Sequence, residues 1–207
     1  MSILGNSWNA FSPEIASQYL KSYGHPSVSS KVLLTDVLRK LTKHIKLPNC
    51  IDLGCGNGQL GEYFVESGFD CQYTGVDFSD VLLDAARRAL PNSNFIKDDI
   101  NTLVEVTGYF NIAIYSHVIE LLSAPEDSLA AAKRVADKIV IRFYEPPEFE
   151  TDSVELRWLD VGSTDQVPYL RRKMSRDYYS LILSRLGCKS VDIYRDVTKD
   201  QIHVLHF

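Results

Sequence analysis

Residues Cys50–Gly61, with the sequence CIDLGCGNGQLG, indicate the fold of this chain more strongly than any other stretch. Apolar residues lead up to Asp52, and four glycines follow within eight positions: Gly54, Gly56, Gly58 and Gly61. A helical pattern then runs from about residue 58 to 67. A strand that ends in a glycine-rich bend before a helix is typical of a ligand site in an open α/β sheet, because a bare backbone lets a ligand approach closely.

Short apolar runs alternate with helical patterns from residue 50 onward. The apolar runs are Cys50–Leu53, Tyr73–Val76, Asn94–Ile96, Phe110–Tyr115 and Lys138–Phe143. Helical patterns follow the first, second and fourth runs, near 58–67, 81–90 and 127–135. This alternation predicts a parallel sheet with helices on both faces, joined by right-handed crossovers.

The C-terminal part of the chain departs from this alternation. A helix around 176–186 precedes apolar runs at 190–194 and 202–207, and the short connection between these runs predicts an antiparallel last strand. Between 145 and 175 lies an insert whose Val154–Leu159 and Val167–Met174 could form a hairpin over the edge of the sheet. The sequence therefore predicts a doubly wound, mostly parallel Rossmann-like sheet of seven strands.

Composition and charge exclude several classes of protein. The chain has 207 residues, 45% of them hydrophobic, and a net charge of −5, which argues against a general nucleic-acid binder. Its four cysteines show neither CxxC spacing nor a zinc-type histidine cluster, so we expect reduced thiols and no metal. No signal-peptide pattern is visible, and no apolar run approaches the roughly 20 residues that a membrane span needs. We expect a cytoplasmic protein without a membrane partner.

Two kinds of ligand fit the glycine loop. Gly56–Gly61 satisfies G-x-G-x-x-G and Asp77 follows 21 residues after Gly56, which also describes the dinucleotide site of an NAD-dependent oxidoreductase. Asp52 favours the other ligand, since a carboxylate at this strand end would oppose a pyrophosphate. It suits S-adenosylmethionine, which carries an ammonium and a sulfonium and no phosphate. Asp77 could then accept both ribose hydroxyls.

Four segments in order resemble the motifs of the class I S-adenosylmethionine-dependent methyltransferases. Ile51–Gly58 is similar to the first motif, Thr74–Asp80 to the acidic second, Phe95–Ile100 to the third and Phe110–Leu122 to the fourth. The resemblance implies S-adenosylmethionine as the cofactor and methyl transfer as the reaction. An acidic chain with a compact lid favours an O or N atom of a small molecule as the acceptor. A peptide or protein acceptor, and a catalytically silent relative, stay open as alternatives.

The resemblance also implies roles for ten residues at the ends of the strands. The methionine half of the cofactor would be faced by Asp52, Gly54 and Gly56. The ribose and adenine would be bound by Asp77, Phe78, Asp99 and Ile100, with Phe78 and Ile100 on the two adenine faces. Tyr115, Ser116 and His117 would sit below the transferable methyl. His117 could act as a general base near neutral pH, or could simply cap a helix or fill the core.

We expect one domain, 1–207, in four parts: a helical lid over 1–46, a cofactor-binding core over 48–143, a substrate-side insert over 145–175, and a C-terminal helix and hairpin over 176–207. The acceptor should lie beyond the carboxyl ends of the strands, under the lid and the insert. Tyr19 and Tyr23 of the lid could contact it. Glu145 could attract an amine, whereas Arg171 and Arg172 could clamp a carboxylate or phosphate, so the sequence leaves the charge of the acceptor open.

Overall fold

The computed structural model describes residues 7–19, 29–161 and 166–207, and within them it confirms the predicted sheet. Seven strands lie in the order β3-β2-β1-β4-β5-β9-β8. They are β1 (Asn49–Leu53), β2 (Gln72–Asp77), β3 (Asn94–Lys97), β4 (Phe110–Ser116), β5 (Ala136–Phe143), β8 (Ser190–Arg195) and β9 (Gln201–His206). The strands β1 to β5 pair in parallel, whereas β9 is antiparallel to β5 and to β8, as expected for the last strand.

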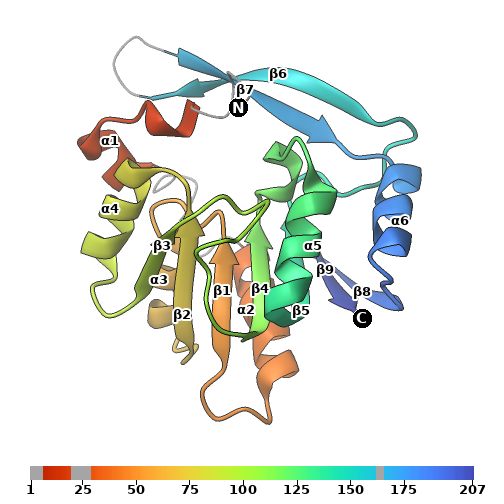
Figure 1. Cartoon of the computed structure of the whole chain (residues 1–207), viewed down its shortest axis with the longest axis horizontal. Coiled ribbons are helices and arrows are strands. Elements are labelled where there is room, and N and C mark those ends of the chain that lie inside the picture. Colours follow the sequence, from red (N-terminus) through yellow and green to blue (C-terminus); the bar gives the residue numbers. More distant parts are fainter. Residues whose placement is uncertain (1–6, 20–28, 162–165) are drawn as a thin grey trace.

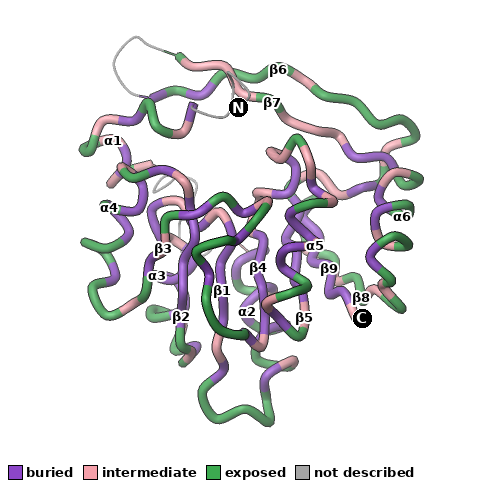
Figure 2. The backbone as a smooth tube through the Cα atoms, in the orientation of Figure 1, coloured by how far each residue is buried: buried purple, intermediate pink, exposed green. Residues whose placement is uncertain are grey.

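Helices cover both faces of the sheet (Figure 1). They are α1 (Pro13–Gln18), α2 (Ser29–Thr42), α3 (Gln59–Glu66), α4 (Asp80–Ala89), α5 (Pro125–Val135), α6 (Arg176–Arg185) and the short 3₁₀ helix η2 (Ile119–Leu121). Leu129 of α5 packs on one face with Ala113 of β4, while Leu34 of α2 packs on the other with Ile112. Because successive side chains of a strand point to opposite faces and both faces are covered, the central strands are buried along most of their length (Figure 2).

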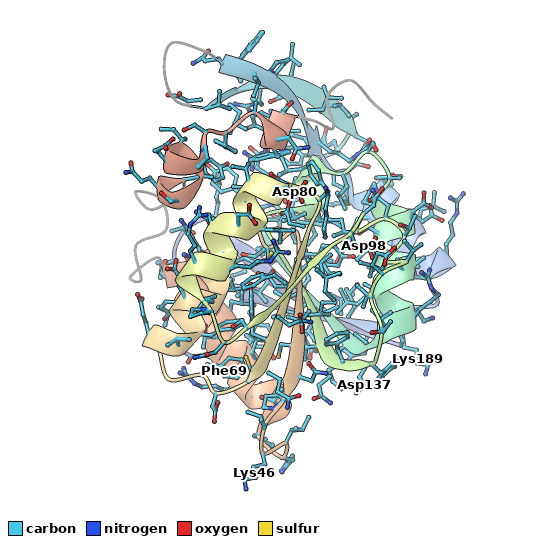
Figure 3. The ribbon with its side chains drawn as sticks, turned by 60° about the vertical axis from the view of Figure 1, so that its left-hand side comes forward. Lys46, Phe69, Asp80, Asp98, Asp137 and Lys189 are labelled. Atoms are coloured by element: carbon cyan, nitrogen blue, oxygen red, sulfur yellow. The ribbon has the colours of Figure 1, made fainter. Side chains whose placement is uncertain are left out.

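The parallel strands direct their carboxyl ends to one edge of the molecule. Lys46 and Phe69, which precede β1 and β2, lie at one end, while Asp80 and Asp98, near the ends of β2 and β3, lie at the other (Figure 3). The loops after β1, β2 and β4 therefore meet at this carboxyl edge, where ligands bind in open α/β sheets. A surface hollow of about 520 Å³, lined in part by Asn49, lies at the opposite edge and belongs to a different surface.

A separate hairpin lies over the carboxyl edge. Its strands β6 (Ser153–Asp160) and β7 (Gln166–Lys173) pair antiparallel and form a second sheet, which crosses the top of Figure 1. The N-terminal segment before α1 lies beside it: the rings of Trp8 and Tyr169 are 5.7 Å apart, and the Ser7 hydroxyl donates to the Pro168 carbonyl at 2.5 Å. The hairpin and the N-terminal segment together form a roof over the strand ends.

The described part of the expected lid over 1–46 lies in two places. The helix α1 and the turn before it lie at the roof, against α4. The helix α2 instead packs Leu34 and Leu38 into the core against β9 and α3. Its apolar positions recur at a spacing of three and four along the whole helix, and such a stripe is stable only when a sheet or helix covers it.

The structure contains neither a candidate membrane span nor a candidate metal cluster within the described ranges. No helix there is long and apolar enough to cross a membrane. No three His, Cys, Asp or Glu side chains there lie close enough together to hold a metal ion. The four cysteines are free thiols.

Candidate active site

The glycine loop connects β1 to α3 and bends back over β2. Gly54, Gly56 and Gly58 have φ angles of 78°, 55° and 85°, a conformation that favours glycine. The Gly54 amide donates to the Val76 carbonyl at 2.8 Å. A methyl group added at Gly54 would lie 2.7 Å from the Val118 side chain, whereas one added at Gly56 would meet nothing within 4 Å. The loop is therefore tightly packed at its start and open at Gly56.

Asp52 lies at the end of β1, with only 2% of its surface exposed. Its Oδ2 accepts from the Tyr73 hydroxyl at 2.6 Å, but no described residue donates to the buried Oδ1. Burial raises the pKa of Asp52 to about 7, although the hydrogen bond from Tyr73 opposes the shift. A buried carboxylate oxygen without a donor is costly, and a cationic ligand removes that cost.

Asp77 ends β2 and joins two main-chain segments. Its Oδ2 accepts from the Gly56 amide and its Oδ1 from the Ser79 amide, both at 2.9 Å. Burial raises the pKa of Asp77 even though both amides favour the ionised form. Each carboxylate oxygen has a second lone pair, so Asp77 can fix the loop and still accept a ligand hydroxyl. Phe78, the next residue, is partly exposed at the same edge.

Two neighbouring aspartates after β3 have different tasks. The exposed Asp99 accepts through Oδ1 from the main-chain and side-chain amides of Asn101, at 2.9 and 2.7 Å. Asp98, which the sequence did not single out, is buried and accepts from the amides of Asp99 and Glu105, each at 2.7 Å. Ile100 is buried in the core. The loop thus presents Asp99 at the surface, while Asp98 holds its shape.

Tyr115 and Ser116 end β4, and neither hydroxyl is free. The Tyr115 ring is fully buried, and its hydroxyl donates to the Ser128 carbonyl of α5 at 2.8 Å. The Ser116 hydroxyl accepts from Nη1 of Arg142 at 2.9 Å. The resemblance placed both residues below the transferable methyl, but Tyr115 could reach a cofactor there only through its main chain, because its side chain fills the core.

Replacing Tyr115 by Phe tests this placement. We expect the free energy of unfolding to fall by about 1 kcal/mol, because one buried hydrogen bond is lost while Ser128 keeps its bond to the Ile100 carbonyl. The affinity for S-adenosylhomocysteine should not change. Urea unfolding and calorimetric titration measure the two quantities. Weaker binding at unchanged stability would show that the Tyr115 hydroxyl contacts the cofactor.

His117 follows β4 in the left-handed region, with φ of 59°, a conformation uncommon for residues with a side chain. Its Nε2 lies 2.9 Å from Oδ2 of Asp200, and its ring packs edge-on against Tyr144. Burial lowers the pKa of His117, although the hydrogen bond with Asp200 opposes the shift, so the imidazole is neutral at pH 7. Asp200 could not be predicted as the partner of His117, because it lies 83 residues away in an ordinary turn.

The opposite charges of the insert pair with each other. Nε of Arg171 lies 3.2 Å from Oε2 of Glu145, an ion pair without the angle of a hydrogen bond. Arg172 pairs with Asp152, and the Arg171 guanidinium also lies 4.3 Å from the centre of the Tyr144 ring. Glu145, Arg171 and Arg172 therefore each have a partner of opposite charge within the chain, and neither sign of charge is left to set the charge of an acceptor. The sequence could not show this, because the pairing depends on how the β6–β7 hairpin docks.

The main chain of the N-terminal segment accepts hydrogen bonds from side chains that follow β1 and β2. The side-chain amides of Asn57 and Gln59 donate to the Tyr19 carbonyl at 2.8 and 2.7 Å. The Ser79 hydroxyl donates to the Trp8 carbonyl at 2.9 Å. The Tyr19 ring packs within the lid, in the cluster that contains Trp8. Tyr23 lies outside the described residues.

The chain resembles known methyltransferases in both sequence and fold. Residues 50–138 match the family model described as "Methyltransferase domain". The fold is similar to that of the CcbJ methyltransferase from Streptomyces caelestis, with a TM-score of 0.72 over 98% of each chain at 12% identity. It is also similar to CalS10, an amino pentose methyltransferase from Micromonospora echinaspora, with a TM-score of 0.66 over 90% of this chain and 95% of that one at 16% identity. The four motifs of the sequence analysis all fall within residues 50–138, the part of the chain that matches this family model.

Curated relatives share part of this sequence. A trans-aconitate 2-methyltransferase from Rhizobium rhizogenes is 36% identical over 87 residues, which are 42% of this chain and 32% of that protein. A demethylmenaquinone methyltransferase from Chlamydia pneumoniae is 27% identical over 132 residues, 61% of this chain and 56% of that protein. The chain thus spans about a third of the first relative and just over half of the second.

Proposed function

We propose that this protein is an S-adenosylmethionine-dependent methyltransferase that acts on an O or N atom of a small molecule. One observation carries the proposal: Oδ1 of Asp52 is a buried acceptor to which no described residue donates, and it lies at the start of the glycine loop, which is open at Gly56. The ammonium of S-adenosylmethionine would supply that donor, and its ribose hydroxyls fit the remaining lone pairs of Asp77. NAD fits less well, because its diphosphate would bring negative charge to two buried carboxylates.

The residues of this chain would act mainly by alignment. S-adenosylmethionine, when bound, supplies a methyl group that its sulfonium already activates. Holding the reacting atoms about 3 Å apart can then remove roughly 7–11 kcal/mol of the barrier. Asp52 and Asp77 would fix one reactant, and the roof of α1 and the β6–β7 hairpin would keep water from the other. His117 would take the proton of a hydroxyl acceptor, whereas an amine would need to arrive deprotonated.

The roof supports a small acceptor rather than a polymer. The N-terminal segment is held to the glycine loop by Asn57 and to the hairpin by the contact of Trp8 with Tyr169, so both sides of the carboxyl edge are covered. The net charge of −5 argues against a nucleic-acid acceptor. A peptide or protein acceptor would require the hairpin to move away from the strand ends.

Calorimetric titration of the full chain with S-adenosylhomocysteine and with NAD tests the proposal. We expect S-adenosylhomocysteine to bind with a micromolar dissociation constant and NAD to give no binding heat. Tight binding of NAD alone would overturn the proposal in favour of an oxidoreductase. Binding of S-adenosylhomocysteine, together with no transfer of labelled methyl to any fraction of a small-molecule extract, would instead favour a catalytically silent domain.

A further inference from the structure

His117 and Asp200 meet at the carboxyl edge although they are 83 residues apart in sequence. The Asp200 side chain is 8% exposed and the His117 side chain is 30% exposed, so the pair is closed on the side of the carboxylate and open on the side of the ring. Nε2 of His117 lies 2.9 Å from Asp200, and no described residue forms a hydrogen bond with Nδ1. One ring nitrogen is therefore fixed, and the other can meet a ligand.

We propose that Asp200 is a positioning residue that holds the proton of His117 on Nε2 and thereby makes Nδ1 the base for a hydroxyl acceptor. The inference rests on the proposed methyltransferase function. A neutral imidazole has one N–H and one lone pair, and the partner of the first nitrogen decides which nitrogen keeps the lone pair. An ionised carboxylate accepts hydrogen bonds only, so Nε2 must be the donor.

Side-chain contacts keep Asp200 ionised, and a main-chain contact helps to keep it in place. Burial by itself would raise the pKa of Asp200, but the hydrogen bonds with His117 and Ser30 and the charge of Arg142 outweigh it and lower the pKa. Nε of Arg142 lies 3.7 Å from Oδ2 of Asp200, while its Nη1 donates to Ser116. The Asp200 amide donates to the Thr198 hydroxyl at 3.2 Å. The carboxylate is thus anchored from β5 and from its own turn.

The backbone fixes the direction of the imidazole. The His117 amide donates to the Arg142 carbonyl at 2.9 Å, and the left-handed φ of 59° turns the residue out of the line of β4. Several charged groups face the ring from other elements: Asp200, Arg142, Glu120 and, across the Tyr144 ring, Arg171 and Lys199. Strained backbone of this kind persists where surrounding contacts require it, which is common at functional sites.

The proposed step balances without a further reactant. The acceptor hydroxyl gives its proton to Nδ1 of His117, and its oxygen forms a bond to the methyl carbon. The electron pair of the broken carbon–sulfur bond stays on the sulfur. The products are a methyl ether, a neutral thioether and an imidazolium, whose charge Asp200 offsets. A carboxylate acceptor has no proton to give, so the inference concerns alcohols and phenols.

Nitrogen-15 NMR of the histidine rings in the cofactor-free full chain measures the tautomer, with His117→Gln used to assign the signals. We expect the Nε2–H form of His117 in the wild type and a shift toward Nδ1–H in Asp200→Asn, whose amide can donate to Nε2. Asp192→Asn is the matched control, because Asp192 makes the same contact with His206 at 3.0 Å on the exposed part of the β8–β9 hairpin. An Nδ1–H form in the wild type, or no change in Asp200→Asn, would overturn the inference.

Methyl transfer from labelled S-adenosylmethionine to a panel of phenols and matched anilines gives a second readout. Asp200→Asn should lower kcat for phenols at least about 100-fold and leave kcat for anilines within about threefold. Asp192→Asn should change neither, and equal losses on both classes would contradict the assignment. If no probe is methylated, the tautomer decides. Failure of the wild type to bind S-adenosylhomocysteine would refute the proposed function, whereas normal binding with the wrong tautomer would refute only the role of Asp200.

Discussion

Asp52→Asn is expected to stabilise the folded protein above neutral pH. Burial raises the pKa of Asp52 from 3.8 to about 7, so its stabilising contribution is present below pH 4 and is lost as the pH rises through 7. That shift corresponds to about 4 kcal/mol, and the variant should recover part of it, because the amide oxygen still accepts from Tyr73. Urea unfolding should show no difference from the wild type at pH 4 and the largest difference at pH 8.

The same variant is expected to bind the cofactor weakly. Loss of the proposed charged acceptor for the ammonium should reduce the affinity for S-adenosylhomocysteine about 10- to 100-fold at pH 8. In the wild type the affinity should also fall about tenfold for each pH unit below 7, because Asp52 takes up a proton there, and the variant should lack this slope. Calorimetry over this pH range measures both effects.

Two controls define the Asp52 experiment. 5′-Methylthioadenosine lacks the amino-acid half and should bind equally to the wild type and to Asp52→Asn. Asp70→Asn removes an exposed carboxylate near the opposite edge of the sheet and should affect neither stability nor binding. If Asp52→Asn bound S-adenosylhomocysteine as tightly as the wild type at every pH, Asp52 would not face the ammonium.

Asp77→Ala is expected to lose the cofactor almost completely. The change removes the acceptor of the Gly56 and Ser79 amides together with the proposed acceptor of the ribose hydroxyls. Two lost charge-assisted hydrogen bonds predict a fall in affinity for S-adenosylhomocysteine on the order of 1000-fold. Asp80→Ala is the matched control, because Asp80 is exposed three residues further on and pairs only with Lys97 at the surface.

A deoxy analogue separates the two roles of Asp77. The wild type should bind 5′-methylthioadenosine more tightly than its 2′-deoxy form, and Asp77→Ala should bind both equally weakly. A variant that still distinguishes the two nucleosides would show that Asp77 shapes the loop without touching the ribose. Thermal unfolding of the variant in the absence of ligand would then show how far the loop depends on the two amide contacts.

The parallel core could be predicted because its signals are local. Each central strand is buried on both faces, so Ile112–Tyr115 and Ile139–Ile141 read as unbroken apolar runs. The bend at Gly54 and Gly56 could be recognised for a similar reason, since both residues adopt positive φ angles. The hairpin in the insert was also recognisable from its two apolar runs, and its position over the strand ends from the rule that ligands bind beyond the carboxyl ends of parallel strands.

The chemistry beside the core could not be predicted, because it depends on contacts between distant segments. Asp200 lies beside His117 because β9, the strand that follows Asp200, lies between β5 and β8 in the sheet. Arg171 is paired with Glu145 only because the docked β6–β7 hairpin places the two side chains together. The direction of the Tyr115 side chain could not be predicted either: the residue lies near the end of a strand at the expected site, but its ring follows the pleat into the core.

The attachment of the lid has a consequence for engineering. The N-terminal segment is held by hydrogen bonds from Asn57, Gln59 and Ser79 to the carbonyl oxygens of Tyr19 and Trp8. Every amino acid presents a main-chain carbonyl oxygen in the same way. The exposed side chains of α1 can therefore be exchanged in a combinatorial library without removing these three hydrogen bonds. New acceptor preferences could be selected there while the nucleoside-binding half of the molecule stays untouched.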